Sequence, residues 1–227
     1  MSRNKRNFSG TLLSRPDLRR IAELIEPGSR VLDLGCGNGE FLHYLAAAKQ
    51  VKGLGIEINP QKIDQCVHLG IPVIHGDLNE PLDYLEDQSF DCVLLTRTLQ
   101  ELTHPEHLLR EVTRVGRRGL VGFINFGHIR NRMQFFFQGR MPRSRTLPHA
   151  WYNTPNIHLG TLRDFRELCA ELDIEILHAV PTGPARGFFA RLLPNFLARA
   201  AVFEIRKRPA ADADPASERE KPEQKSN

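Results

Sequence analysis

The stretch "DLGCGNGEF", residues 33–41, carries three glycines at alternating positions between a short apolar run and an apolar helical pattern. A strand, a glycine-rich turn and a helix form the nucleotide-binding unit of doubly wound sheets. Glycine lets the chain turn tightly there and lets a ligand approach without a Cβ in the way. The dinucleotide-binding pattern G-x-G-x-x-G would require a glycine where Glu40 stands, and the Gly-Lys-Ser/Thr ending of a phosphate-binding loop is also absent. The loop therefore indicates a nucleoside site of another kind.

Acidic residues on both sides of the loop indicate the charge of the ligand. Asp33 precedes the loop, and Glu40 opens the following helix, where a diphosphate would otherwise lie on the positive helix end. Two carboxylates beside a bound diphosphate would repel it. We therefore expect a nucleoside without phosphates that is positively charged near the loop. S-adenosylmethionine fits through its sulfonium and α-amino groups, and S-adenosylhomocysteine is the related alternative.

Two more carboxylates stand at the ends of predicted strands. Glu57 ends the second strand, where an acidic side chain can accept both ribose hydroxyls. Asp77 ends the third strand, where it can accept from the adenine amino group while the Leu78 backbone donates to the ring. The predicted ligand-binding residues are Asp33, Gly35, Cys36, Gly37, Gly39, Glu57, Ile58, Asp77, Leu78 and Thr96.

These residues depend on a regular alternation of strands and helices. Apolar runs predict strands at 30–35, 51–59, 72–77, 90–96, 119–126, 174–180 and 201–207. Helical spacing of apolar residues predicts helices at 14–26, 59–70, 103–116 and 161–173, and one after the glycine loop. A capping box is expected from Thr103 to Glu106. Such alternation predicts an α/β fold, a doubly wound and mostly parallel seven-stranded sheet. In this pattern, residues 29–126 resemble the Rossmann-like class I S-adenosylmethionine-dependent methyltransferases.

Composition places the chain among globular proteins. It has 227 residues, of which 41% are hydrophobic and 26% charged, and no apolar run is long enough to span a membrane. No secretion signal is visible at the N-terminus. The four cysteines show no pairing pattern, so we expect free buried thiols in a reducing cytosol. We expect a flexible N-terminus at 1–13, one domain at 14–208 with a loop-rich lid or docking insertion at 125–160, and a disordered tail at 209–227.

No residue is assigned to catalysis. The Asn/Asp-Pro-Pro-Tyr pattern of enzymes that methylate amide or amine nitrogens is missing. His104 and His107 are spaced to chelate a metal, but no third ligand is nearby, so no metal site is predicted. His128, His149 and His158 fall in the insertion, where one of them could be a general base or all could bind loop backbone.

A one-signed stretch of charge remains open to two interpretations. Residues 112–163 contain no Asp or Glu. The stretch carries Arg114, Arg117, Arg118, Arg130, Arg132, Arg140, Arg143, Arg145 and Arg163. This field could attract an acidic ligand, an acidic partner surface or nucleic acid. Alternatively, it is a solubilising face whose counter-charges come from other parts of the fold.

Several segments together resemble the family of methionine biosynthesis protein MetW over roughly residues 29–205. They are "RVLDLGCGNGE", "TLQELTHPEHLLREVTRVGR", "NFGHIRNR", "GRMP", "LP…WYNTPNIH" and "DF…LC". Departures from the family pattern occur at Thr96, Arg97, Ile124 and His149, and Arg97 lies at the mouth of the expected pocket. The resemblance implies a bacterial cytoplasmic protein that works with homoserine O-acyltransferase (acetyl- or succinyl-) in the first committed step of methionine synthesis. It implies no established methyl acceptor.

Three functions follow as hypotheses. The first is an accessory or regulatory subunit that binds S-adenosylmethionine, in which residues 128–152 form a docking surface or a lid. The second is an active methyltransferase on a small molecule under that insertion. The third is a nucleic-acid methyltransferase, against which the aromatic residues cluster as "FFF" and "WY" instead of alternating with the arginines.

Overall fold

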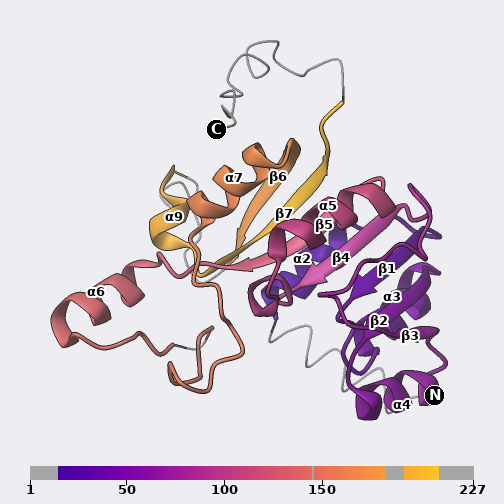
Figure 1. Ribbon diagram of the computed structural model, residues 1–227, viewed down its shortest axis with the longest axis horizontal. Helices are drawn as coiled ribbons and strands as arrows, with labels where there is room; N and C mark the ends of the chain where they lie inside the picture. Colours follow the sequence, from indigo (N-terminus) through magenta and orange to yellow (C-terminus); the bar gives the residue numbers. More distant parts are fainter. Residues whose placement is uncertain (1–14, 145, 183–191, 210–227) are drawn as a thin grey trace, which may run out of the picture.

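A computed structural model describes residues 15–144, 146–182 and 192–209 of the chain (Figure 1). The predicted flexible N-terminus therefore lies outside the described residues, as does the predicted disordered tail apart from Pro209. No helix in these described ranges has the length and hydropathy of a membrane span.

The described chain contains one seven-stranded sheet with the order β3-β2-β1-β4-β5-β7-β6. The strands are β1 (Arg30–Leu34), β2 (Lys52–Glu57), β3 (Val73–His75), β4 (Cys92–Thr96), β5 (Gly119–Ile124), β6 (Ile174–Thr182) and β7 (Ala200–Lys207). The first five strands pair in parallel, and β7 runs antiparallel to both β5 and β6. This confirms the predicted doubly wound, mostly parallel sheet. The strand order reverses beside β1, which places a switch point between β1 and β4, where such sheets bind ligands.

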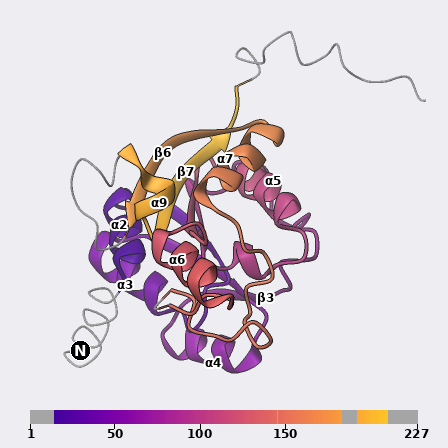
Figure 2. The ribbon, with the colours of Figure 1, turned by 90° about the vertical axis from the view of Figure 1, so that its left-hand side faces the viewer.

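Helices cover both faces of the sheet (Figure 2). They are α2 (Pro16–Leu24), α3 (Glu40–Lys49), α4 (Pro60–His68), α5 (Pro105–Val115), α6 (Ile129–Gln138), α7 (Leu162–Glu171) and α9 (Pro194–Leu197), with a 3-10 turn, η1 (Leu99–Glu101). Alternate residues of the strands enter two separate cores. Val31 packs with α2 and α3, whereas its neighbour Leu32 packs with α5 and α7. A strand buried on both faces has no polar alternation, which explains the apolar runs of β4 and β5.

The prediction of a capping box from Thr103 to Glu106 is wrong. Helix α5 begins after His104, and no side chain caps it. Pro105 occupies the first turn and has no N–H, so one of the amides that a cap would satisfy is missing. The amide of Thr103 instead donates to Asn79 Oδ1 at 2.9 Å. A complete capping box stands at α7, between Thr161 and Asp164.

The insertion is also more ordered than the sequence predicted, because the expected loop-rich section contains helix α6. The Nδ1 atom of His128 caps the helix by accepting from the amide of Arg130, and Gly139 ends it in a left-handed conformation with φ 59°. Only Asn131 of this helix is buried. Periodicity analysis detects a helix by its core-facing apolar stripe, and α6 does not pack such a stripe against the sheet.

Candidate functional site

A cavity of about 280 Å³ opens at the carboxyl ends of β1, β2 and β3, next to the switch point. Its walls come from the glycine loop, the ends of β2 and β3, and the segment after β4. The lining residues are Gly35, Ile56, Glu57, Ile58, Lys62, Gly76, Asp77, Leu78, Asn79, Thr98, Glu101 and Leu102. Parallel strands bring their carboxyl ends to one edge of the sheet, so residues far apart in the sequence meet here.

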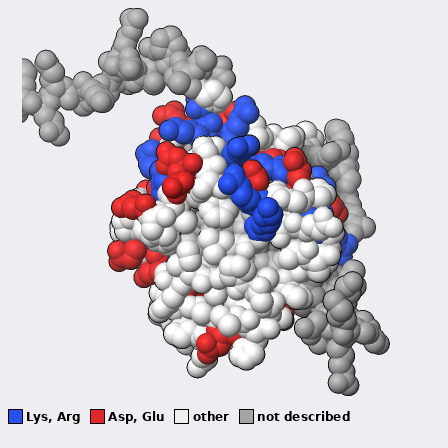
Figure 3. Space-filling model, turned by 90° about the vertical axis from the view of Figure 1, so that its right-hand side faces the viewer, with Lys and Arg blue, Asp and Glu red and all other residues white. Residues whose placement is uncertain are grey.

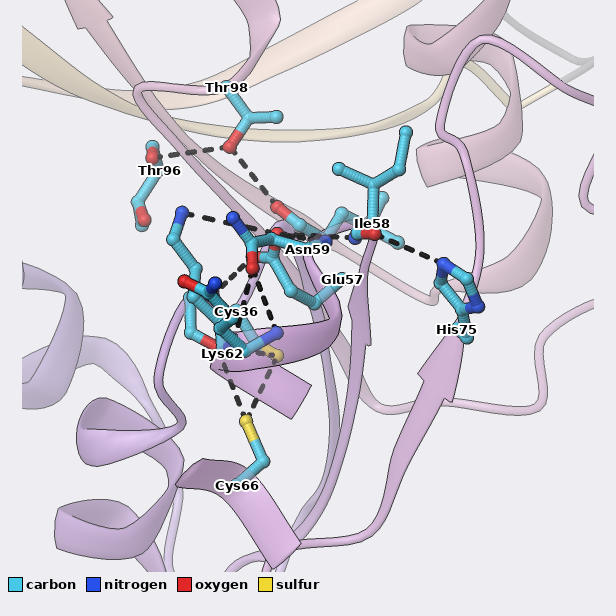
Figure 4. A network of polar contacts seen from close by, with 12 residues as sticks. Cys36, Glu57, Ile58, Asn59, Lys62, Cys66, His75, Thr96 and Thr98 are labelled. Atoms are coloured by element: carbon cyan, nitrogen blue, oxygen red, sulfur yellow. Dashed lines mark hydrogen bonds and ion pairs between the residues drawn. The ribbon is translucent and has the colours of Figure 1, made fainter. Parts of the chain in front are cut away.

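Glu57 is the most constrained side chain of the cavity (Figure 4). It is almost fully buried, and its Oε2 atom accepts from the amide of Gly37 at 2.9 Å. Its Oε1 atom accepts from the amides of Ile58 at 3.1 Å and Asn59 at 3.0 Å. The Lys62 ammonium lies 3.9 Å from Oε1. Glu57 thus joins the glycine loop to the end of β2 and fixes the position of both.

The backbone conformation and the close packing of the loop require glycine at several of its positions. Gly35, Gly37 and Gly39 all have positive φ, between 61° and 76°. A Cβ at Gly35 would lie 2.7 Å from Thr98 Oγ1, and a Cβ at Gly39 would lie 2.9 Å from Cys66 Sγ. Nothing lies within 4 Å of the Cβ direction at Gly37. The first and third glycines are therefore required by the protein itself, whereas the middle one leaves open space.

Cys36 turns away from the cavity into the core. Its Sγ atom lies 3.9 Å from Cys66 Sγ. A Cβ added at Gly55 would lie 2.4 Å from the Cys36 Sγ atom. Burial raises the pKa of Cys36 far above that of a free thiol. All four cysteines are buried free thiols, as the sequence predicted.

Asp33 lies at the end of β1 and is buried, and its Oδ1 atom has no hydrogen-bond partner in the described part of the chain. Burial raises the pKa of Asp33 to about 7; the Arg15 guanidinium opposes this shift, and the Glu57 carboxylate adds to it. A buried carboxylate without a partner is costly, and a cation placed beside it would stabilise its charged form.

Asp77 and Leu78 form the opposite wall. Asp77 Oδ1 accepts from both the amide and the side-chain Nδ2 of Asn79 at 2.9 Å, which holds the turn after β3. Leu78 is buried and lines the cavity. The turn therefore presents a carboxylate and an apolar side chain to the same space.

Of the predicted residues, the cavity wall includes Gly35, Glu57, Ile58, Asp77 and Leu78. Gly37 contacts the site through its amide, which donates to Glu57. Thr96 contacts the wall residue Thr98, whose hydroxyl donates to the Thr96 carbonyl at 3.4 Å. The wall residues that the sequence did not predict are Ile56, Lys62, Gly76, Asn79, Thr98, Glu101 and Leu102. Glu101 and Thr98 belong to the segment directly after β4, which is the position in the fold that could have pointed to them.

Arg97 is a neighbour of the site without lining it. It has a positive φ of 66°, and its Nε atom lies 3.3 Å from Asp17 Oδ2. Asp17 also binds Arg15 at 2.6 Å. The residue that departs from the family pattern therefore ties the end of β4 to the start of α2.

The insertion is fixed to the site through Gln100. The carbonyl of Gln100 accepts from the amides of Ile157 at 2.9 Å and His158 at 3.1 Å. Its side chain donates to the carbonyl of His158 at 3.1 Å and accepts from the amide of Ile124 at 2.9 Å. Burial raises the pKa of the adjacent Glu101, opposed by Lys62 and by His149 of the insertion. The insertion thus lies within electrostatic reach of the cavity.

Part of the arginine-rich stretch has its counter-charges in the fold. Arg114 pairs with Glu111 at 2.6 Å and Asp87 at 2.7 Å, and Arg118 pairs with Glu204 at 2.9 Å. Further pairs join Arg117 to Asp91 and Arg163 to Glu167. Figure 3 shows the same mixture on another face, where Lys and Arg lie beside Asp and Glu and a wide area is uncharged. No group of His, Cys, Asp and Glu suited to a metal occurs among the described residues.

Comparison with known proteins decides the family. The model of the family described as methionine biosynthesis protein MetW matches residues 15–205. The chain belongs to the MetW family. A bifunctional methionine biosynthesis protein MetXA/MetW of Rhodopirellula baltica is 36% identical over 169 residues, which are 70% of this chain and 27% of that relative. The MetW-type chain therefore spans about a quarter of that relative's length.

Solved structures show the same fold. An S-adenosylmethionine-dependent methyltransferase from Mesorhizobium loti matches with a TM-score of 0.62 at 19% identity, over 84% of this chain and 96% of that one. A putative methyltransferase of Haloferax volcanii, solved with the Trm112 methyltransferase activator, matches with a TM-score of 0.61 at 15% identity, over 88% and 93%. The MetW-type chain therefore has the class I methyltransferase fold, which by itself does not define a reaction.

Proposed function

We propose that this MetW-type chain binds S-adenosylmethionine, or S-adenosylhomocysteine, and acts as an accessory or regulatory subunit of homoserine O-acyltransferase in the bacterial cytoplasm. The observation that carries the partnership is the relative in which MetXA and MetW are parts of one polypeptide. The MetW resemblance implies a homoserine O-acyltransferase as that partner. Modules fused in one chain are expected to work on the same process when they occur as separate proteins.

The residues of the cavity fit the adenosyl ligand. Glu57 uses three of about four carboxylate acceptor positions on backbone amides, which leaves one for a ribose hydroxyl unless the loop shifts. Asn79 donates only to the Oδ1 atom of Asp77. The Oδ2 atom of Asp77 is the proposed acceptor for the adenine amino group. The unpartnered Asp33 Oδ1 provides a counter-charge for the ligand's cationic end.

Binding should depend on pH through Asp33. Below its pKa of about 7 the carboxyl group is protonated and offers no charge to a cationic ligand, whereas above that pH it is anionic. Affinity should therefore rise as the pH rises through 7 and then level off. We expect a dissociation constant about tenfold weaker at pH 6 than at pH 8. Isothermal titration calorimetry at the two pH values, in buffers of different ionisation enthalpy, measures both the constant and the proton released.

The control for this prediction is Asp33→Asn. Because the ligand's own α-amino group also titrates, the part of the pH dependence that belongs to the protein is the part this variant removes. The variant should bind weakly and with nearly the same affinity at both pH values. A pH dependence equal to that of the unmodified chain would contradict the role of Asp33.

The regulatory role predicts coupling between the ligand and the partner. If S-adenosylmethionine is a signal, it must change the affinity of the chain for the acyltransferase, and the change must be reciprocal. We expect a shift of about fivefold or more in that dissociation constant when the ligand is saturating. Biolayer interferometry with purified homoserine O-acyltransferase measures it. Binding of equal strength with and without the ligand would leave an accessory subunit without a sensing function.

Methyl transfer to a small molecule is the second candidate. The observation that favours it is Glu101, a carboxylate in the cavity wall whose pKa is raised by burial, as a proton acceptor would require. Incubation of the protein with methyl-labelled cofactor and a bacterial metabolite extract tests it. Label transferred by the protein, and absent with Glu101→Gln, would establish the enzyme, whereas label that stays on the cofactor would count against it.

A further inference from the structure

Helix α6 projects from the carboxyl edge of the sheet (Figure 1, Figure 2). Most of its side chains are exposed. Phe135 is 56% exposed, Phe136 79% and Phe137 71%. A groove of about 630 Å³ separates this helix from α9. The groove is lined by Ile129, Arg132, Met133, Phe135, Phe136 and Phe196. Exposed apolar patches of this kind mark interaction sites in folded proteins.

The same segment carries positive charge without compensation. Arg130, Arg132, Arg140 and Arg143 form no ion pair within the described ranges, although Arg132 binds the carbonyl of Gly127 and Arg143 that of Pro148. The other arginines of the acid-free stretch that the structure describes each have a carboxylate partner; they are Arg114, Arg117, Arg118 and Arg163. Uncompensated arginines beside exposed aromatic rings are the composition of an interface with an acidic partner.

We propose that helix α6 and its groove with α9 are the surface that docks on the acyltransferase, in an apolar groove of that enzyme rimmed by carboxylates. This inference rests on the proposed function, which supplies the partner, and adds the surface and its chemistry. Consecutive residues of a helix are separated by roughly 100°, so Phe135, Phe136 and Phe137 spread over roughly 200° of its circumference. A protein groove can surround a helix over such an arc.

The other occupants fit less well. A flat membrane surface requires one apolar side and one polar side on a helix, which three consecutive phenylalanines do not provide. A second copy docked through the same surface would place these arginines against each other without any Asp or Glu from 112 to 163 to pair with them. Phe136 and Phe137 meet edge to face at 5.1 Å, as do Trp151 and Tyr152 at 5.8 Å, which does not give the parallel platforms that stacked nucleic-acid bases need.

The base of the insertion is held firmly enough to present this helix. The amide of Phe126 donates to the carbonyl of Gly160 at 3.0 Å, which closes the base across the insertion. Asn131 donates to the carbonyl of Phe126 at 3.0 Å. Gln100, which binds His158 in the returning loop of the insertion, precedes the cavity residue Glu101. The hydrogen bond between Gln100 and His158 therefore connects the insertion, which carries α6, to the wall of the ligand cavity.

The test compares variants of the full chain with an equally exposed apolar residue elsewhere. Phe136→Asp alters the proposed surface, and Arg140→Glu reverses a positive charge just beyond the end of α6. Val67→Asp, at a residue 64% exposed on α4, is the matched control. Binding to purified homoserine O-acyltransferase is measured by biolayer interferometry, and thermal unfolding and S-adenosylmethionine titrations are run on each variant. We expect Phe136→Asp to weaken partner binding by at least about 30-fold. Arg140→Glu should weaken it less, and Val67→Asp should bind as the unmodified chain does, with unfolding and ligand binding unchanged in all three.

The other outcomes distinguish an error in the proposed function from an error in the proposed docking surface. If the unmodified chain does not bind the acyltransferase, the proposed function is wrong and the docking proposal falls with it. If the unmodified chain binds and Phe136→Asp binds equally well, the partnership stands and the surface is wrong. If gel filtration shows a dimer that Phe136→Asp dissociates, or if salt-dependent binding of a short single-stranded RNA is lost in the same variants, the surface belongs to a second copy or to nucleic acid, and the proposal is overturned.

Discussion

Glu57→Gln is expected to weaken S-adenosylmethionine binding by at least about 100-fold, since hydrogen bonds to a charged group contribute about 1.5–3 kcal/mol each. The Glu57 carboxylate has two functions, and the side-chain amide of glutamine cannot perform both. It accepts from the amides of Gly37, Ile58 and Asn59, and it is the proposed acceptor of a ribose hydroxyl. An amide places an NH₂ group opposite at least one of these N–H donors. Calorimetric titration gives the dissociation constant.

The control is Glu80→Gln, an exposed glutamate close to the turn after β3 that does not line the cavity. It should bind the ligand as the unmodified chain does. Thermal unfolding of both variants separates loss of binding from loss of fold, because a folded Glu57→Gln protein with intact affinity would show that Glu57 only holds the loop.

Gly35→Ala is expected to lower the free energy of unfolding by about 2–5 kcal/mol. The new methyl group would lie 2.7 Å from Thr98 Oγ1 and 3.1 Å from its Cγ2, and the residue would also have to adopt φ 76°. Thr98 is branched at Cβ and donates to the carbonyl of Leu34 at 3.3 Å, so it cannot turn away without losing that bond. Urea unfolding followed by circular dichroism measures the loss.

Gly70→Ala separates the two causes. Gly70 has a similar φ of 71°, but nothing lies within 4 Å of its Cβ direction, so only the backbone strain of about 1–2 kcal/mol remains. Adding Thr98→Ala to Gly35→Ala should recover the part due to the contact. Equal losses for Gly35→Ala and Gly70→Ala, with no recovery in the double variant, would show that Thr98 does not constrain the loop.

The sheet could be predicted from the sequence because its signals are local. Residues such as Val31 and Leu32 enter different cores, which leaves continuous apolar runs, and glycines with positive φ mark the turns. Helix α6 could not be predicted, because it does not pack an apolar stripe against the sheet and buries only Asn131. The capping box failed at Thr103 because Asn79, distant in the sequence, takes its amide.

Those residues of the site that follow strands could be predicted from the sequence, whereas those placed by packing could not. Glu57 and Asp77 follow strands, and the carboxyl ends of parallel strands meet at one edge, so their proximity follows from the pattern. Lys62 and Glu101 were missed because their approach to the cavity depends on how α4 and the turn after β4 pack. Cys36 faces the core, and which way a loop residue turns is not encoded in spacing.

The central claim is that the cavity above β1, β2 and β3 takes a cationic adenosine derivative. Calorimetric titration of the full chain with S-adenosylmethionine, and in parallel with NAD⁺ and with ATP, tests it most directly. We expect saturable binding of S-adenosylmethionine that Glu57→Gln weakens by at least about 100-fold, and no binding of the two phosphate-bearing nucleotides. Saturation by NAD⁺ or ATP, with S-adenosylmethionine left unbound, would contradict it.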